Sequence, residues 1–317
     1  MRILLIGEAR PHNLEFFYQK AFRQLGHEVT FIDQTDGVSD SLFFRVLMTR
    51  TSLFRRYLKT LKVNTTLDFR VDRIGPDLIV IFKGHFLDSE VIRSITQSYK
   101  TVLVYPDSSR FKPILRNRVK YFNTVFTQDN NKKHFMKLGA KRVVTLPFAC
   151  DPDFHKNLAV EKKYPISFIG TFYPNRYFKL RRIQHHIDVF GNWWIIKVGQ
   201  THPAVYGFDY VRAINESAIN VNVHHGTDLT ADAPNMRTFE VTGCGGFICT
   251  EYMPSMSSYF TSDEVQTYRS GRELAEVIEC YLDDPGSIVE VGLKAQQKCY
   301  ARHTYLKRAQ SLISSLS

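Results

Sequence analysis

The residues best suited to bind a ligand lie in DAPNMRTFEVTGCGGFICT, residues 232–250. Pro234 favours the first turn of a helix, where its missing N–H would have had no partner, and Asp232 is the expected N-cap. Arg237 and Glu240 stand three residues apart and share one side of that helix. Free N–H groups at such an N-terminus attract a diphosphate, and a carboxylate one turn further can accept both ribose hydroxyls. The alternative is a surface ion pair, worth roughly 0.2–0.5 kcal/mol.

A second group with suitable chemistry is FIGTFYPNRYFKLRR, residues 168–182. Gly170 directly follows a predicted strand, and the absence of a side chain there lets the backbone approach a phosphate. Arg176 and Lys179 follow on a predicted basic helix and can neutralise a diphosphate leaving group. The alternative is a solvated basic helix face. We favour the binding interpretation, because this loop and residues 232–250 both follow strands of one predicted parallel sheet.

Weaker candidates lie at the ends of other predicted strands. His224 and His225 follow a strand and can line the same site, although two histidines without a third ligand are usually structural. Lys83-Gly84-His85 and Tyr105-Pro106-Asp107 end two strands of the N-terminal half, where His85 or Asp107 can bind or orient an acceptor hydroxyl. Asp151-Pro152-Asp153 has the spacing of a metal-binding DxD motif, but it reads better as a turn, and we expect no metal.

Two successive strand–helix series position these residues. In the first, strands are predicted at 2–7, 28–32, 78–82, 101–105, 124–127 and 143–146, with helices over 14–25, 89–97 and 130–138. In the second, strands are predicted at 165–170, 193–198, 219–224 and 247–250, and an amphipathic helix covers 290–316. The first strand, helix and strand form a βαβ unit, which predicts a parallel, doubly wound sheet. The sequence thus predicts two Rossmann-like domains joined near residue 155.

Positive charge is concentrated in the first predicted domain. Residues 1–150 contain 25 Lys and Arg against 13 Asp and Glu, whereas the rest contains 17 against 18, in a chain of net charge +11. An anionic partner is therefore expected for the first domain alone. Five cysteines without a CxxC pair argue against a disulfide framework or a zinc ribbon. Since no signal peptide or transmembrane run is apparent, a cytoplasmic protein is expected.

The basic segment LFFRVLMTRTSLFRRYLKTLKV, residues 42–63, has six Lys and Arg interleaved with apolar residues and no acid. Such a stretch suits an anionic membrane surface, which would attach the protein peripherally to the inner membrane. It also suits nucleic-acid phosphates. A third interpretation is a packed helix with a cationic outer face.

The segment RTFEVTGCGGFICT, residues 237–250, resembles the donor-domain signature of retaining GT-B glycosyltransferases. A closer resemblance is to the CgeB-like (spore-maturation protein) glycosyltransferases. Segments similar to theirs occur over most of the chain and in the expected order. The matching segments are PDLIVIFKGHF (76–86), FTQDNNKKHFMKLGAKRVVTLPFACDPDFH (126–155), ISFIGTFYPNR (166–176) and ARHTYLKRA (301–309). Retaining GT-B enzymes carry two glutamates eight residues apart. In this chain the first of the two acids is an aspartate, Asp232. The resemblance therefore supports the role of Glu240 as ribose ligand more strongly than a role for Asp232.

The resemblance implies a GT-B fold, in which two Rossmann-like domains face a cleft and a C-terminal helix crosses back to the first domain. It implies an acceptor domain over 1–155, a donor domain over 156–300 and a crossover helix over 301–317. A nucleotide-diphosphate sugar would be co-substrate, without cofactor or metal, and a hexose or pentose would pass to an acceptor hydroxyl with retention. The anionic acceptor would be a membrane-associated glycan, a surface polymer or DNA.

The resemblance and the positions along the strands imply three sets of site residues. The expected donor-binding residues are Gly170, Thr171, Arg176, Lys179, His224, Asp232, Asn235, Arg237, Thr238 and Glu240. The expected acceptor-side residues are Glu8, Arg10, His12, Lys83, His85 and Asp107. The expected catalytic residues are Arg176, Lys179, His85 and Asp107.

Two alternatives stay open. An inverting GT-B transferase would use Asp107 or His85 as a general base. A GT-B-like nucleic-acid-binding protein without catalysis would explain the basic half, but not the constellation of Glu240 and Arg176. An NAD-type dehydrogenase is disfavoured, because Glu8, Ala9 and Arg10 follow Gly7 where a GxGxxG motif would continue.

Overall fold

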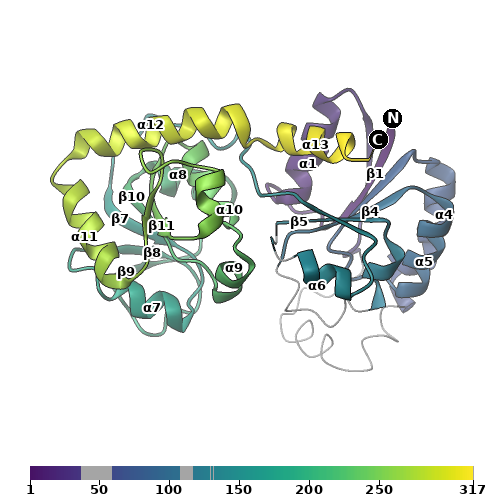
Figure 1. The fold of residues 1–317 in the computed structure, drawn as a ribbon, viewed down its shortest axis with the longest axis horizontal. Helices are drawn as coiled ribbons and strands as arrows, with labels where there is room; N and C mark the ends of the chain where they lie inside the picture. Colours follow the sequence, from purple (N-terminus) through teal and green to yellow (C-terminus); the bar gives the residue numbers. More distant parts are fainter. Residues whose placement is uncertain (37–58, 108–116, 129, 131, 317) are drawn as a thin grey trace. The chain divides into compact units, whose positions relative to one another are not determined.

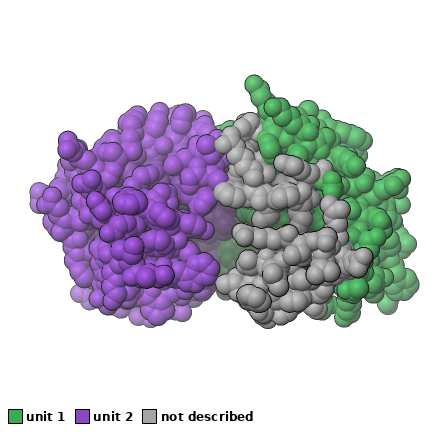
Figure 2. Space-filling view, turned by 90° about the horizontal axis from the view of Figure 1, so that it is seen from below, with its two compact units in different colours: residues 1–146, 309–317 green, residues 147–308 purple. Residues whose placement is uncertain are grey.

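The computed structural model describes residues 1–36, 59–107, 117–128, 130 and 132–316. The chain forms two compact units: unit 1 is Met1–Leu146 with Ala309–Ser317, and unit 2 is Pro147–Arg308 (Figures 1 and 2). Residues 42–58 of the basic segment 42–63 lie outside the described residues. Among the described helices, none has both the length and the hydropathy to cross a membrane.

Unit 1 is built on a parallel sheet in the order β2-β1-β3-β4-β5-β6. Its strands are β1 (Arg2–Gly7), β2 (Glu28–Asp33), β3 (Leu78–Phe82), β4 (Thr101–Tyr105), β5 (Thr124–Thr127) and β6 (Arg142–Thr145). Its helices are α1 (Leu14–Gln24), α4 (Lys62–Ile74), α5 (Ser89–Ser98), α6 (Lys132–Lys137) and the 3₁₀ turn η3 (Val119–Tyr121). Strands β3 and β4 are buried along their whole length, as expected for a parallel sheet covered on both faces. The predicted βαβ unit and the six predicted strands are confirmed.

Unit 2 repeats the architecture with the strand order β12-β11-β10-β7-β8-β9. Its strands are β7 (Tyr164–Ile169), β8 (Asp188–Phe190), β9 (Gln200–His202), β10 (Ser217–Asn222), β11 (Phe247–Glu251) and β12 (Gln266–Tyr268). Its helices are α7 (Pro174–Leu180), α8 (Gly207–Asn215), α9 (Gly226–Ala231), α10 (Met236–Gly243), η4 (Pro254–Ser258), α11 (Gly271–Leu282), α12 (Pro285–Arg302) and the start of α13 (Tyr305–Ser314).

The strand order of each sheet reverses at one point. In unit 2 the chain proceeds outward from β7 to β9, returns to pair β10 beside β7, and then proceeds outward on the other side. In unit 1 the reversal lies between β1 and β3. Ligands of open α/β sheets bind outside the carboxyl ends of the strands at such a reversal. The fold therefore directs attention to the residues that follow β7 and β10 and to those that follow β1 and β3.

Two predicted elements are wrong. Residues 193–198 form no strand: the strands are β8 and β9 on either side, and Ile195 is 90% exposed. The apolar run WWII resembled a buried strand, but only Trp194 of its four residues is buried. The single helix over 290–316 is two helices, α12 and α13, because the chain breaks at His303 and Thr304.

That break lets the two connections between the units run together. The Cys150 N–H donates to the His303 carbonyl at 2.9 Å, and the Tyr305 N–H donates to the Cys150 carbonyl at 3.0 Å. Beyond Arg308 the chain belongs to unit 1, where Arg142 and Lys100 donate side-chain hydrogen bonds to carbonyls of its last residues, at 2.6 and 2.8 Å. The predicted return of the C-terminal helix to the first domain is thus confirmed.

Candidate functional site

Arg176 is the centre of a cationic group at the carboxyl ends of β7 and β10. Pro174 begins α7, which places Arg176 in its first turn. Its guanidinium is buried: Nε donates to the Val223 carbonyl at 3.1 Å and Nη1 to the Thr171 carbonyl at 2.7 Å. Its charge lies over the rings of Tyr173 and Phe168, 4.9 and 5.4 Å from their centroids. Among the described residues, no carboxylate lies within ion-pair distance of this buried cation.

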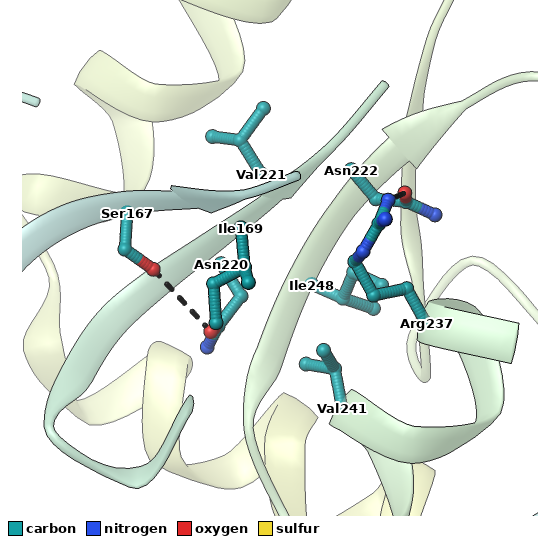
Figure 3. A pocket seen from close by; sticks show the side chains of 8 residues that line it. All are labelled: Ser167, Ile169, Asn220, Val221, Asn222, Arg237, Val241 and Ile248. Atoms are coloured by element: carbon teal, nitrogen blue, oxygen red, sulfur yellow. Dashed lines mark hydrogen bonds between the residues drawn. The ribbon is translucent and has the colours of Figure 1, made fainter. Parts of the chain in front are cut away.

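A second arginine comes to the same place from α10. The Arg237 guanidinium lies 6.0 Å from the centroid of the Phe168 ring, which Arg176 also covers. Its Nη1 donates to Asn222 Oδ1 at 3.2 Å (Figure 3). Burial lowers the pKa of Arg176 to about 9, and the like charge of Arg237 adds to that effect. Arg176 and Arg237 thus lie over the same Phe168 ring. A bound anion would offset the free-energy cost of burying these two charges and would reduce the repulsion between them.

Lys179 and a buried carboxylate complete the group. The Lys179 ammonium donates to Glu251 Oε1, and Glu251 Oε2 accepts from the His224 N–H at 2.6 Å. The His224 ring is buried, and its Nε2 accepts from the Asn235 N–H at 3.3 Å, which leaves the proton on Nδ1. This Nδ1 lacks a hydrogen-bond partner within the described chain. Burial and the neighbouring cations hold the pKa of His224 well below its usual value, so the ring is neutral.

The N-terminus of α10 is capped differently from the prediction. Asn235, not Asp232, is the N-cap, and its side chain accepts from the Thr238 N–H at 3.3 Å. Asp232 ends the preceding helix α9 in a left-handed conformation (φ 50°), and its Oδ1 accepts from the Ser255 N–H at 3.0 Å. The predicted N-cap was wrong because Pro234 precedes the helix instead of starting it.

Glu240 is buried one turn inside α10, so it is not half of a surface ion pair with Arg237. Its Oε2 accepts from the Tyr210 hydroxyl at 2.8 Å, and its Oε1 lies 3.7 Å from His155 Nε2. Burial raises the pKa of this carboxyl, whereas the Tyr210 hydrogen bond and the Arg237 charge lower it. The carboxylate therefore depends on these neighbours to stay ionised.

A pocket of about 210 Å³, which includes space open to solvent, lies between the sheet and α10 (Figure 3). It is lined by Ser167, Ile169, Asn220, Val221, Asn222, Arg237, Val241 and Ile248. Ser167 and Asn220 share a hydrogen bond at 3.5 Å inside it. Polar side chains are unusual in a buried parallel strand. Here Ser167, Asn220 and Asn222 line the same pocket as Arg237.

In unit 1 the structure brings Lys83 and Asp107 together at the carboxyl ends of β3 and β4, with Nζ 3.4 Å from Oδ2. Lys83 and Gly84 both have left-handed backbones (φ 59° and 64°), which turns the chain sharply after β3. Burial lowers the pKa of Lys83, but Asp107, Glu15 and Glu8 together raise it above its usual value. This cation thus faces three carboxylates beside the strand reversal.

The other acceptor-side candidates are more scattered. Glu8 and Arg10 form an ion pair at 3.3 Å, and the His12 ring lies against Phe16. His85 is turned inward, 9% exposed, with Nε2 3.2 Å from the Tyr105 hydroxyl. His85 is therefore worse placed than Asp107 to meet a substrate.

Sequence reasoning missed four residues of the unit 2 site: Glu251, Asn222, Tyr210 and His155. Glu251 directly follows the predicted strand 247–250, and a charge at that position was a usable signal. Asn222 interrupts an apolar strand, which was another. Tyr210 reaches Glu240 from a distant part of the chain, and no local pattern marks it. His155 ends the segment 126–155, which the family resemblance includes but in which no role was expected for it.

Gly170→Ala is expected to lower the free energy of unfolding of unit 2 by about 1–3 kcal/mol, the usual cost of overpacking. A Cβ at this position would lie 3.0 Å from the Phe168 ring and 3.1 Å from Arg176 Nη1. Urea unfolding followed by tryptophan fluorescence measures it, because both tryptophans, Trp193 and Trp194, belong to unit 2. The control is Gly226→Ala, whose Cβ would meet nothing within 4 Å. Equal stability of the two variants would contradict the close packing around Arg176.

Comparisons with known proteins give a family match for part of the chain and fold neighbours for all of it. Residues 176–314 match the family described as "Glycosyl transferase-like", a match that begins at Arg176 and includes Glu240. No curated protein matches the chain.

Several solved structures share the fold along the whole chain. Sucrose-phosphate synthase from Thermosynechococcus elongatus has a TM-score of 0.69 at 10% identity, covering 100% of this chain and 98% of that one. Anabaena HepE, solved with UDP and glucose, has a TM-score of 0.68 at 12% identity, covering 100% and 99%. T4 phage BGT, solved with its UDP-glucose substrate, has a TM-score of 0.64 at 12% identity, covering 99% of each. The predicted GT-B fold is confirmed.

Proposed function

We propose that this chain, with a GT-B fold and a glycosyl transferase-like match over residues 176–314, is a glycosyltransferase that moves a sugar from a nucleoside-diphosphate donor to an acceptor hydroxyl. The observation that carries the proposal is the buried Arg176, beside Arg237 and without a carboxylate partner among the described residues. A buried cation without a counter-charge is costly unless a ligand supplies one. The UDP and UDP-glucose bound to fold neighbours support a nucleotide as that ligand.

The donor is held in unit 2. Arg176, Arg237 and Lys179 bind the diphosphate, and Glu240 accepts hydrogen bonds from the ribose hydroxyls. His224, buried beside these cations, supports the donor site, with Nδ1 3.9 Å from Glu251 Oε2. Gly170 leaves room for the Arg176 guanidinium. The remaining expected donor residues, Thr171, Asp232, Asn235 and Thr238, shape the loops around this group.

Transfer proceeds with retention and without a metal ion, in keeping with the resemblance to CgeB-like transferases. As the glycosidic bond breaks, negative charge grows on the leaving diphosphate, and the fixed cations of unit 2 stabilise it. The acceptor oxygen attacks from the face that the diphosphate leaves, and a donor phosphate oxygen helps to take its proton. The transferred sugar is a hexose or a pentose.

The acceptor binds to unit 1, whose half of the sequence carries the excess positive charge. A membrane-associated glycan, a surface polymer and DNA all supply the anionic groups that this charge favours. One fold neighbour is a DNA-modifying β-glucosyltransferase, which supports DNA as one of these acceptors. All five cysteines are free thiols, four of them buried, which favours a reducing, cytoplasmic location.

An inverting mechanism is a second candidate, favoured by one observation. Asp107 lies at the carboxyl end of β4 and is paired with Lys83. A carboxylate at this place can take the proton of the acceptor hydroxyl directly. The anomeric configuration of the product separates the two mechanisms.

The donor proposal is tested by thermal unfolding with UDP, GDP, ADP and CDP. At 100 times its Kd a bound nucleotide stabilises the native state by about 2.7 kcal/mol, which raises the Tm of a domain of this size by roughly 5–10 °C. We expect at least one of the four to do so, and the protein to hydrolyse the matching nucleotide sugar slowly without acceptor. No stabilisation by any of the four would overturn the proposed function.

A further inference from the structure

We infer that Tyr210 is a positioning residue that holds the Glu240 carboxylate in the orientation and charge state needed to accept the ribose hydroxyls, with the buried ring of His155 beside the other carboxylate oxygen. This inference rests on the proposed function and extends the donor site to Tyr210, which lies in no segment that carries the family resemblance. Tyr210 lies on α8 and His155 in the turn after Asp151, so three separate parts of unit 2 meet at one carboxylate.

Tyr210 fixes one carboxylate oxygen. Its hydroxyl donates to Glu240 Oε2 at 2.8 Å, a good length for a charge-assisted hydrogen bond. The tyrosine ring is half-buried, and α8 begins only one turn earlier, at Gly207. The donor therefore projects from a rigid helix instead of from a loop.

His155 faces the other oxygen with a defined tautomer. The Asp151 N–H donates to His155 Nδ1 at 2.9 Å, so Nδ1 is the accepting nitrogen and the proton is on Nε2. That Nε2 lies 3.7 Å from Glu240 Oε1, and the ring is only 1% exposed. The Asp151 turn is also closed by side-chain bonds to the N–H groups of Asp153 and Phe154. The segment Asp151-Pro152-Asp153 thus forms a turn, as expected, and this turn fixes the orientation of the His155 ring.

These two partners matter because the carboxylate is buried. The ionisable groups around Glu240 are Tyr210 from α8, His155 from the turn, and Arg237 and Cys244 from α10 and its end. Burial favours the protonated carboxyl, and a protonated carboxyl donates one hydrogen bond where the ribose needs two acceptors. Without the Tyr210 hydrogen bond the carboxyl would take up a proton at higher pH.

The test is Tyr210→Phe, with UDP affinity measured by calorimetry at pH 8 and pH 6. If the four-nucleotide screen ranks another nucleoside diphosphate higher, that compound replaces UDP. We expect Kd to rise about tenfold at pH 8, since a hydrogen bond to a charged group is lost. At pH 6 the gap to wild type should widen by roughly a further threefold, because the folded pKa of Glu240 has moved up. The phosphate of UDP titrates in the same way in every experiment. A difference between two proteins in how Kd changes with pH therefore comes from the proteins themselves.

Two further variants make the outcome unambiguous. Tyr99→Phe is the matched control: the Tyr99 hydroxyl also donates to a carboxylate, Asp72 Oδ1 at 2.7 Å, but in unit 1, and its loss should leave UDP affinity unchanged. Glu240→Gln removes the titrating group, so adding Tyr210→Phe to it should weaken binding less than threefold further, by non-additivity within one network.

The possible failures are distinguishable. If Tyr210→Phe binds UDP like wild type at both pH values while Glu240→Gln binds weakly, the positioning role is overturned and donor binding by Glu240 stands. If Glu240→Gln itself binds UDP like wild type, the assignment of Glu240 to the ribose is wrong. Additive losses in the double variant would also count against the positioning role.

Discussion

Arg176→Ala is expected to reduce kcat by about 100- to 1000-fold, with a much smaller change in KM for the donor. Removing one preoriented charge that stabilises a developing oxyanion typically costs this much in an enzyme. Arg176 has this position because its guanidinium is buried, fixed by the carbonyls of Val223 and Thr171, and free of a competing carboxylate within the described chain. The measurement is steady-state transfer or, before an acceptor is known, hydrolysis of the nucleotide sugar identified by the thermal screen.

The matched control is Arg181→Ala. Arg181 follows α7 directly and lies over the rings of Tyr177 and Phe178, but it is exposed. Its loss should leave kcat within about twofold of wild type, as for a surface side chain. If Arg176→Ala raises KM and leaves kcat unchanged, Arg176 binds only the ground state of the donor. Equal losses in both variants would indicate a general basic surface instead of a built site.

Glu240→Ala is expected to weaken nucleoside-diphosphate binding by about 1–3 kcal/mol, because two ribose hydroxyls lose a charged acceptor. Calorimetry with the nucleotide selected in the screen measures this loss. The fold should survive, since burial already disfavours the Glu240 charge and its removal relieves that cost. Tryptophan fluorescence, which reports unit 2, checks this expectation.

The control for Glu240 is Glu290→Ala on α12. Glu290 forms an exposed i,i+4 ion pair with Lys294 at 2.7 Å, the kind of pair that the alternative interpretation assigned to Arg237 and Glu240. Its removal should change nucleotide affinity by less than about 0.5 kcal/mol. If Glu240→Ala behaves like Glu290→Ala, Glu240 does not belong to the donor site.

Most of the fold follows from local sequence patterns. Short apolar runs such as Leu78–Phe82 are buried on both faces of a parallel sheet, so such runs favour strands. The same rule misidentified 193–198, where an apolar run is largely exposed in a loop. The break between α12 and α13 was also invisible, because it is created by pairing of His303 and Tyr305 with Cys150, far away in the chain.

The site was predictable where one segment carries its own chemistry. Arg176, Lys179, Arg237 and Glu240 were candidates because glycines and a strand end lie beside them, and the structure places all four in unit 2. The contacts that define their environment are non-local: Glu251 holds Lys179 from 72 residues away, and Tyr210 reaches Glu240 from another helix. Spacing along a sequence does not encode such contacts, which also decide the charge state of Glu240.

The return of the last segment to unit 1 has a consequence for synthesis. Ala309 and Leu312 are completely buried, and the carbonyls that Lys100 and Arg142 bind come from Leu316 and Ser315. A ribosome adds these residues only after the whole of unit 2, a delay of roughly 10–30 s at about 5–20 residues per second. Throughout that interval unit 1 lacks this segment, and the side chains of Lys100 and Arg142 lack these two acceptors. Unit 1 is therefore complete only after unit 2 has been synthesised.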